Sequence, residues 1–367
     1  MTLSGTVRSP YLYDVMQVSK DVVPKQVVHT VSERESAVVR STYTRTGASL
    51  WASEQRFGWR PYQETAWNQY SRYVPVGRER VEYVTGGDTL WNHVVHHNVV
   101  DVPDLPLAAG MRNAPRAYRP GQRTAERWFG APVRPSIPRG WTRPSVRTGD
   151  TLSLYVPEFT DSDAGHWSFA EAGGFGTGRA TTADDVASAV LYRNEEQTAV
   201  SGNGAWGTFE VAPGKARFRL DLTTARVSDD WHFGVRTHTS WTFRSDTTAE
   251  AAPLPLLQLD YDVPVDAQGA VSRARAHRLA LTVRMQDGMA APRGVHLKAE
   301  ASYDGGKTWT TARTARHDGA PRFTATVERP SKVRGDAYVT LRVTATDSAG
   351  NSVRQTVERA YLHRGTA

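Results

Sequence analysis

Apolar side chains recur at every second position along much of this 367-residue chain. Leu152, Leu154 and Val156, for example, alternate with Ser153 and Tyr155. Because successive side chains of a β-strand point to opposite faces, such a run predicts a strand with one buried face. The same alternation is found over residues 217–222, 233–243, 279–285, 297–303 and 339–345.

The predicted strands are short, and clusters of Gly, Pro, Asp and Asn separate them. This spacing favours antiparallel β-sandwiches over a parallel sheet with crossover helices. Residues 184–193 are compatible with a short helix, but a strand that runs into a turn is preferred because the neighbouring segments are strands. We therefore expect an all-β protein of tandem antiparallel β-sandwich domains.

Two segments interrupt the strand pattern and are interpreted as connectors. Residues 103–144 are dense in Pro, Arg and Gly, and residues 246–255 are mostly small, as in a linker. The turn at residues 347–351, DSAGN, is common in bacterial immunoglobulin-like and fibronectin type III-like domains. The expected domains are a β-sandwich-like domain at 1–105, a jelly-roll-like β-sandwich at 106–250 and an immunoglobulin-like or fibronectin type III-like domain at 251–367.

The composition excludes several classes of protein. There is no cysteine, which excludes disulfide scaffolds, thiolate zinc sites and cysteine nucleophiles. The formal charge is +7, but the basic residues are nearly all Arg and are spread along the chain. Nucleic-acid binding requires them to cluster on one face, so no nucleic-acid partner is expected. The longest apolar runs, such as residues 253–259, are far shorter than the ~18 residues of a membrane span, so none is expected.

Two acidic or histidine-rich segments are candidates for metal binding. Asp161 and Asp163 resemble the start of a calcium loop, but the twelfth position is Ala172 instead of the required Glu. A plain turn is the preferred interpretation, and these two residues stay the calcium candidates. In the second segment, His93, His96 and His97 lack the Glu of a metalloprotease helix. The local alternation predicts a strand with His96 on the opposite face from the other two, so no metal site is assigned there.

Two further motifs have both a structural and a functional interpretation. Residues 302–309, SYDGGKTW, match the Asp-box pattern S-x-D-x-G-x-T-W, which forms a β-hairpin in sialidases and in many unrelated β proteins. Because there is a single copy, a structural hairpin is preferred to a sialidase site. Residues 173–178 are rich in glycine, but no strand and helix flank them, so a loop is preferred to a nucleotide site.

Aromatic residues are abundant, with 11 Trp and 14 Tyr. Alternation predicts that Trp241 and Trp309 lie in the core. A poorly patterned stretch between residues 51 and 73 is a candidate for either arginine stacking or an exposed binding surface. Its residues are Trp51, Arg56, Trp59, Arg60, Tyr62, Trp67, Tyr70, Arg72 and Tyr73.

Five segments combine a distinctive sequence with a distinctive order along the chain. They are residues 81–91 (VEYVTGGDTLW), 116–123 (RAYRPGQR), 126–135 (ERWFGAPVRP), 237–245 (THTSWTFRS) and 339–353 (VTLRVTATDSAGNSV). Together they resemble the region that follows the catalytic domain in large secreted bacterial subtilisin-like serine peptidases. The resemblance extends from Tyr11 to Tyr361.

This resemblance implies a non-catalytic region. Subtilisin-like catalysis uses a Ser nucleophile, a His that takes its proton and an Asp that orients the His. The family's His motif, H-G-T-H, and its Ser motif, G-T-S-M-A-x-P, are absent, and residues 288–292 (GMAAP) match only the end of the latter. No catalytic residue is therefore assigned, and no activity is expected from this chain alone.

The resemblance also implies a location and partners. The expected partners are a catalytic subtilisin-like domain, in the same chain or a separate one, and a protein or cell-surface substrate. The implied location is extracellular, although no signal peptide is visible and the chain would be cytoplasmic if Met1 is the true start. A complete peptidase would carry roughly 300 further residues upstream.

Two other functions stay open. The first is a stand-alone extracellular β-sandwich protein that binds carbohydrate or a cell surface. The second is an enzyme of another class, such as a glycosidase, although the sequence offers no carboxylate pair to name. No cofactor is expected besides the possible calcium ion.

Overall fold

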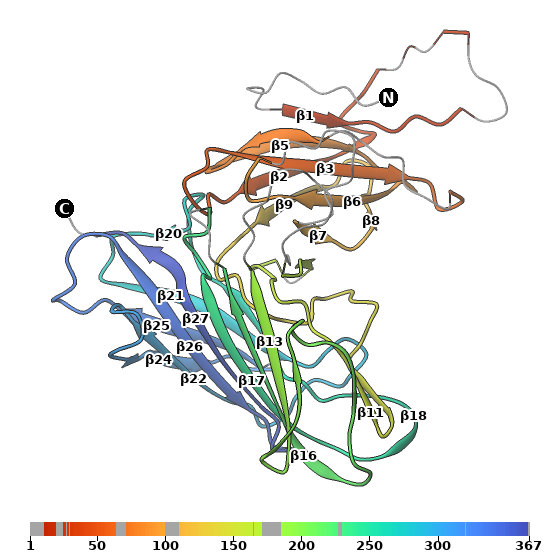
Figure 1. The fold of residues 1–367 in the computed structure, drawn as a ribbon. Helices are drawn as coiled ribbons and strands as arrows, with labels where there is room; N and C mark the ends of the chain where they lie inside the picture. Colours follow the sequence, from red (N-terminus) through yellow and green to blue (C-terminus); the bar gives the residue numbers. More distant parts are fainter. Residues whose placement is uncertain are drawn as a thin grey trace. The chain divides into compact units, whose positions relative to one another are not determined.

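A computed structural model of the chain describes residues 11–19, 25–26, 28, 30–63, 71–99, 110–163, 165–170, 185–226, 230–319 and 321–365. Every regular element in these ranges is a β-strand (Figure 1). Most neighbouring strands are antiparallel, and the sheets pack in pairs. This arrangement confirms the predicted all-β fold of tandem β-sandwiches. No element in the same ranges is a helix with the length and apolar character to cross a membrane.

The chain divides into two compact units, and the three domains expected from the sequence stay a prediction. Unit 1 comprises residues 1–45 and 49–128, and unit 2 comprises residues 46–48 and 129–367. The expected boundary at 105/106 therefore lies inside unit 1, and the one at 250/251 lies inside unit 2.

Unit 1 is a sandwich of two sheets, the first with four strands and the second with five from this unit. The first sheet has the order β1 (Tyr11–Asp14), β5 (Arg78–Thr85), β2 (Ser36–Tyr43) and β9 (Arg123–Trp128). Its two outer strands, β1 and β9, run parallel to their neighbours. Within this unit the second sheet has the order β7 (Met111–Asn113), β6 (Leu90–Val95), β3 (Trp51–Trp59) and β4 (Arg72–Pro75), and β8 (Arg116–Ala117) also pairs with β6.

Unit 2 begins with a second sandwich. One sheet has the order β15 (Trp206–Glu210), β11 (Thr151–Tyr155), β10 (Val146–Gly149) and β18 (Thr248–Pro253). The facing sheet has the order β14 (Glu196–Ser201), β13 (Val186–Arg193), β16 (Ala216–Ala225) and β17 (Arg236–Ser245). Strand β13 confirms that residues 186–193 extend as a strand.

The remaining strands of unit 2 have immunoglobulin topology. One sheet has the order β19 (Gln258–Asp262), β21 (Ala276–Arg284), β25 (Arg322–Glu328) and β24 (Arg313–Arg316), which corresponds to strands A, B, E and D. The other has the order β20 (Ala270–Val271), β27 (Ser352–His363), β26 (Ala337–Thr346), β22 (His296–Ser302) and β23 (Thr310–Thr311). These correspond to A′, G, F, C and C′.

One strand pair joins the two sandwiches of unit 2 into a continuous sheet. Residues 236–242 of β17 pair antiparallel with residues 352–358 of β27 (Figure 1). A single hydrophobic cluster accordingly runs from Ala131 to Tyr361 through both sandwiches. Between them, the indole Nε1 of Trp241 donates a hydrogen bond of 2.8 Å to the Leu257 carbonyl.

The connector predicted at 246–255 is wrong, and the one predicted at 103–144 is wrong in part, because it contains three strands as well as the division between the two units at 128/129. Residues 248–253 form β18, an edge strand that pairs with β10. Within 103–144, residues 111–113, 116–117 and 123–128 form β7, β8 and β9. Edge strands satisfy part of their backbone hydrogen bonds in a sheet without burying a full apolar face, so their sequences lack the alternation that marks inner strands.

The shared core predicts that unit 2 unfolds as one cooperative body. Trp241→Ala removes a side chain that is 1% exposed, and we expect it to lower the free energy of unfolding of both sandwiches together by about 3–5 kcal/mol. Scanning calorimetry checks this. Thr242→Ala, on the solvent side of the same strand, is the control. Two separate transitions, of which only one shifts, would contradict a shared core.

Candidate functional site

Buried charged residues fill the space between the two sheets of unit 1. Arg56 on β3 is fully buried and donates to Asp14 of β1 at 3.2 Å and to Glu82 of β5 at 2.5 Å. Arg80 on β5 bonds to Glu54 at 3.0 Å and to Glu82 at 2.8 Å. We call this group the charge network. It comprises the carboxylates Asp14, Glu54, Glu82 and Glu126 and the guanidinium groups of Arg56, Arg72, Arg80 and Arg116.

The ion pairs keep the charge network ionised in spite of its burial. Burial by itself raises the pKa of Glu82, but Arg56 and Arg80 outweigh it and hold that pKa well below the usual range. The same balance, with Arg72 and Arg80, lowers the pKa of Glu54. The two carboxylates have no exposed side-chain surface, so neither has access to a substrate. The charge network is therefore a polar core and not a reaction centre.

His93 belongs to this core. Its Nδ1 lies 2.9 Å from an Arg56 nitrogen, which is always a donor, so Nδ1 accepts. Its Nε2 lies 3.1 Å from a Glu54 oxygen and donates. Burial and the nearby Arg56 lower the pKa of His93, which fits this neutral form. Both ring nitrogens are thus used, and neither is left for a metal ion.

The other two histidines of this segment are not on the strand that the alternation predicts. Strand β6 ends at Val95, and His96 and His97 follow it with their rings stacked at 5.2 Å. The prediction that alternation continues through His97 is therefore wrong. In the parts of the chain that the structure describes, no three His, Asp or Glu side chains are grouped to hold a metal ion.

The calcium candidates lie at a tight turn in unit 2. Asp161 is fully buried and accepts the backbone N–H groups of Phe129 at 2.8 Å and Asp163 at 2.9 Å. Its carboxylate also lies 3.1 Å from His166 Nδ1, and Asp163 accepts the N–H of Gly165. Both carboxylates therefore hold the turn together, and calcium binding by them stays a prediction.

The Asp box is a structural hairpin, as expected. Asp304 accepts the N–H and the hydroxyl of Thr308 at 2.8 and 2.6 Å, and β22 and β23 pair on either side. The prediction that Trp309 lies in the core is wrong, because this side chain is half-buried and packs against the Arg342 guanidinium, 3.9 Å from its ring centroid. Trp241 does lie in the core, as predicted. The glycine-rich residues 173–178 lie outside the described residues.

The candidate surface between residues 51 and 73 does not form an aromatic row in the described part. Trp51 and Trp59 lie half-buried at the two ends of β3, whereas Tyr62 and Tyr73 are exposed. Arg56 and Arg72 form ion pairs in the charge network, and Arg60 pairs with Asp88. Trp67 and Tyr70 lie outside the described residues.

An aromatic cluster does exist in unit 2, outside the stretch between residues 51 and 73. Tyr155 on β11 and Trp206 on β15 are direct cross-strand partners, and their rings lie 5.0 Å apart. Phe169 packs on Trp206 at 4.5 Å, and Trp167 of β12 (His166–Trp167) packs on Trp141 at 4.9 Å. We call these five half-buried side chains the aromatic cluster. The alternation at 152–156 already indicated that Tyr155 points outward, and this was the available signal.

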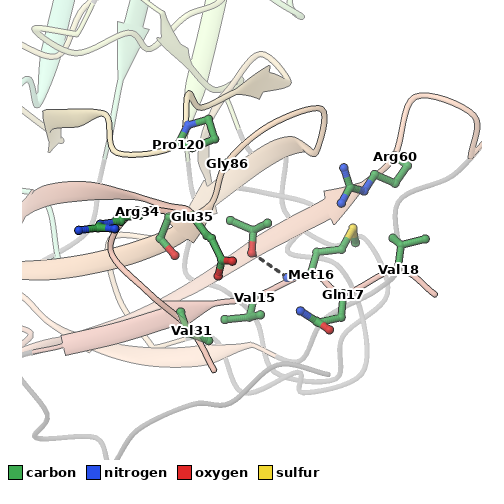
Figure 2. Close-up of a pocket in the computed structure, with 12 residues that line it drawn as sticks. Val15, Met16, Gln17, Val18, Val31, Arg34, Glu35, Arg60, Gly86 and Pro120 are labelled. Carbon is green, nitrogen blue, oxygen red and sulfur yellow. Dashed lines mark hydrogen bonds between the residues drawn. The ribbon is translucent and has the colours of Figure 1, made fainter. Parts of the chain in front are cut away.

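Unit 1 also contains a cavity of about 340 Å³. Figure 2 shows apolar side chains of Met16, Val18 and Val31 around it together with Arg34 and Glu35. The backbone N–H of Met16 donates to the Thr85 hydroxyl at 3.0 Å at this place (Figure 2). The cavity contains none of the residues that the sequence singles out for metal binding.

Comparisons with known proteins yield little. No family model matches the chain, and no curated protein matches it. Among solved structures, the three N-terminal domains of the bacteriophage RB49 Highly Immunogenic Outer Capsid protein (Hoc) are similar at a TM-score of 0.22 and 10% identity, covering 91% of this chain and 99% of that one. A similarity at this level bears on neither the fold nor the function.

The charge network yields a stability prediction for unit 1. Arg56→Met leaves Asp14 and Glu82 buried with one guanidinium partner fewer each, so we expect a loss of about 3–5 kcal/mol in the free energy of unfolding. Arg40→Met, which breaks the exposed pair with Glu79 between β2 and β5, is the matched control and should cost less than about 1 kcal/mol. Urea unfolding followed by tryptophan fluorescence measures the free energy of unfolding of both variants. Equal losses in the two would contradict a stabilising role of Arg56 in the charge network.

A buried histidine predicts how stability depends on pH in the immunoglobulin-like domain. Burial, with His363 nearby, lowers the pKa of His277 to about 4, and its Nε2 lies 2.7 Å from the Tyr361 hydroxyl. Unfolding restores a pKa near 6.5, so between pH 6.5 and 4 the unfolded chain binds a proton that the folded chain excludes. Stability is therefore lost as the pH falls through this window, by up to about 3 kcal/mol.

His277→Gln is expected to flatten this dependence. The measurement is the melting temperature of the wild type and the variant between pH 7 and 4. His317→Gln, at an exposed position of the same domain, is the control and should keep the wild-type slope. Comparison with the wild type cancels other groups, such as Glu158, whose pKa burial raises to about 7. Parallel curves for wild type and His277→Gln would refute the assignment.

Proposed function

We propose that this chain is a non-catalytic accessory region of a secreted subtilisin-like serine peptidase and that it binds the peptidase's substrate or a cell surface. Its partners in this proposal are a catalytic subtilisin-like domain, in the same chain or a separate one, and an extracellular protein or surface. The sequence resemblance and the distribution of polar groups in the fold both support the proposal.

The observation that carries the proposal is that the main groups of ionisable side chains lie in the interior, where they form ion pairs and hydrogen bonds with one another and with the backbone. The charge network neutralises itself between two sheets, and Asp161 is used by backbone N–H groups. What the described surface offers instead is the aromatic cluster of unit 2. A scaffold of this kind is suited to binding and positioning and not to bond-breaking chemistry.

The segments that resemble the peptidase family supply much of this interior. Residues 81–91 contain Glu82 and the buried Trp91, and residues 126–135 contain Glu126 and Trp128. Residues 237–245 and 339–353 form most of β17, β26 and the start of β27, which build the continuous sheet. The resemblance therefore rests on residues that determine the fold, as expected for a region that supports a catalytic domain.

A second function is kept because the aromatic cluster favours it. In this alternative the chain is a stand-alone extracellular β-sandwich protein that binds carbohydrate or a cell surface. The two proposals differ in whether a peptidase domain accompanies the chain.

The size and labelling of the native protein test the proposal. An antibody raised against the chain is used to recover the protein from culture supernatant and from lysate, and a fluorophosphonate probe labels active serine nucleophiles. We expect a secreted, labelled band that either has roughly 300 residues more than this chain or is recovered together with it as a separate protein. An unlabelled band of 40.5 kDa that is recovered without any labelled protein would overturn the peptidase connection and leave the stand-alone binding protein.

A further inference from the structure

We propose that the aromatic cluster of unit 2 is a binding site for a polysaccharide chain of hexopyranose units. The inference rests on the proposed function, in that it names the surface to which the accessory region attaches. It is carried by the composition of the cluster, by its neighbours on the sheet and by the arginine beside it.

The cluster consists of aromatic side chains alone, and all five are only half-buried. Their rings meet edge to face or tilted, with centroid distances from 4.5 to 6.3 Å, so each ring fixes the orientation of the next. Hexopyranose rings present a face of C–H groups that packs on an aromatic ring, and they present hydroxyl groups at their edges. A rigid group of partly accessible rings is suited to such a ligand.

The sheet continues the site with the polar groups that sugar hydroxyls need. On the same face as Tyr155 and Trp206, the next cross-strand pair outward is Ser153 with Thr208, and the pair after that is Thr151 with Glu210. At about 3.4 Å per residue, this strip runs for roughly 14 Å from the aromatic rings to the Glu210 carboxylate. Hydroxyl groups and a carboxylate in a row beside aromatic rings form a track for an extended chain of sugars.

Arg143 adds a directional donor at the edge of the cluster. It is exposed, and its guanidinium group lies 5.5 Å from the centroid of the Trp206 ring. One guanidinium with five N–H donors can bond to sugar oxygens, but it is too little positive charge for a polyanion such as a nucleic acid.

An apolar protein partner fits the surface less well. Aliphatic side chains dominate the buried core of unit 2, against which Trp141 packs, whereas the half-buried rings of the cluster contact one another. The Thr151 hydroxyl donates to Glu210 at 2.8 Å, and the Ser153 and Thr208 hydroxyl groups nearer the rings would lose their hydrogen bonds to water under an apolar partner. A sugar chain replaces those hydrogen bonds.

The test uses the full chain and defined polysaccharides. Insoluble cellulose, chitin and the glycan strands of purified peptidoglycan are used in pull-down assays, and soluble hexasaccharides of glucose and of N-acetylglucosamine are titrated by calorimetry. The variants are Trp206→Ala and Arg143→Ala. The matched control is Trp309→Ala, because Trp309 is likewise half-buried and packed on an arginine but lies in the immunoglobulin-like domain.

We expect the wild type and Trp309→Ala to bind at least one polysaccharide, and Trp206→Ala to lose affinity by about tenfold or more, as aromatic anchors do. Arg143→Ala removes an exposed side chain without disturbing the fold, so a partial loss in this variant supports the site even if Trp206→Ala unfolds. No binding of the folded wild type to any of these polysaccharides would overturn the inference. So would self-association of the wild type that Trp206→Ala abolishes, because the cluster would then be a contact between copies.

The two proposals fail in different ways. A large labelled peptidase band without polysaccharide binding overturns only the inference about the aromatic cluster. Polysaccharide binding by an unlabelled protein of 40.5 kDa that is recovered without any labelled protein overturns only the peptidase connection.

Discussion

The antiparallel pairing of β17 with β27 is the interaction on which unit 2 depends. β27 is the last strand of the immunoglobulin-like domain, and it is paired on one side with β26 and on the other with β17 of the preceding sandwich. Neither domain therefore has a free edge at this place, where an unpaired edge would invite pairing with another chain. The shared sheet also aligns the two cores, which Gln355 connects through hydrogen bonds to Tyr261, Thr239 and the Pro135 carbonyl.

Unit 1 is stabilised by a different kind of interaction. Among its described residues the interior contains small apolar clusters, one around Val39, Val84 and Trp91 and one around Phe57 and Val94, and ion pairs fill much of the remaining space. Burying charges costs free energy of desolvation, and well-placed ion-pair partners roughly compensate this cost. Such a core therefore specifies the geometry of the fold more than it adds stability. Unit 2 has the opposite character, with one extensive apolar cluster.

The sequence predicts those features that depend on one strand at a time. Alternation identified the inner strands of unit 2, including the outward position of Tyr155 and the inward position of Trp241. It failed at edge strands such as β18, and it gave no signal for β3, whose sequence WASEQRFGW is polar although its middle is buried. The hydrophobicity of the sequence does not indicate whether Arg56 is exposed or forms ion pairs in the interior, because its partners come from distant strands.

The candidate sites also divide into those formed by neighbouring residues, which the sequence predicts, and those formed by distant segments, which it does not. The Asp-box hairpin was predictable because its hydrogen bonds lie within a few residues of one another. The aromatic cluster was not, because Trp141 packs on Trp206 and Trp167 packs on Trp141 from segments that are far from β15 along the sequence. Only the folded arrangement of these segments brings their rings together.

The spacing of the charge network along the chain constrains how unit 1 can form during synthesis. Its carboxylates range from Asp14 on the first strand to Glu126 on the last, and both strands pair in parallel with their neighbours. When synthesis has reached residue 100, three carboxylates and three guanidinium groups of the charge network have been made, but Arg116 and Glu126 have not. The last ion pair and the outer strand β9 are added only when residues 116–128 emerge, so we infer that unit 1 closes late and in one step instead of hairpin by hairpin.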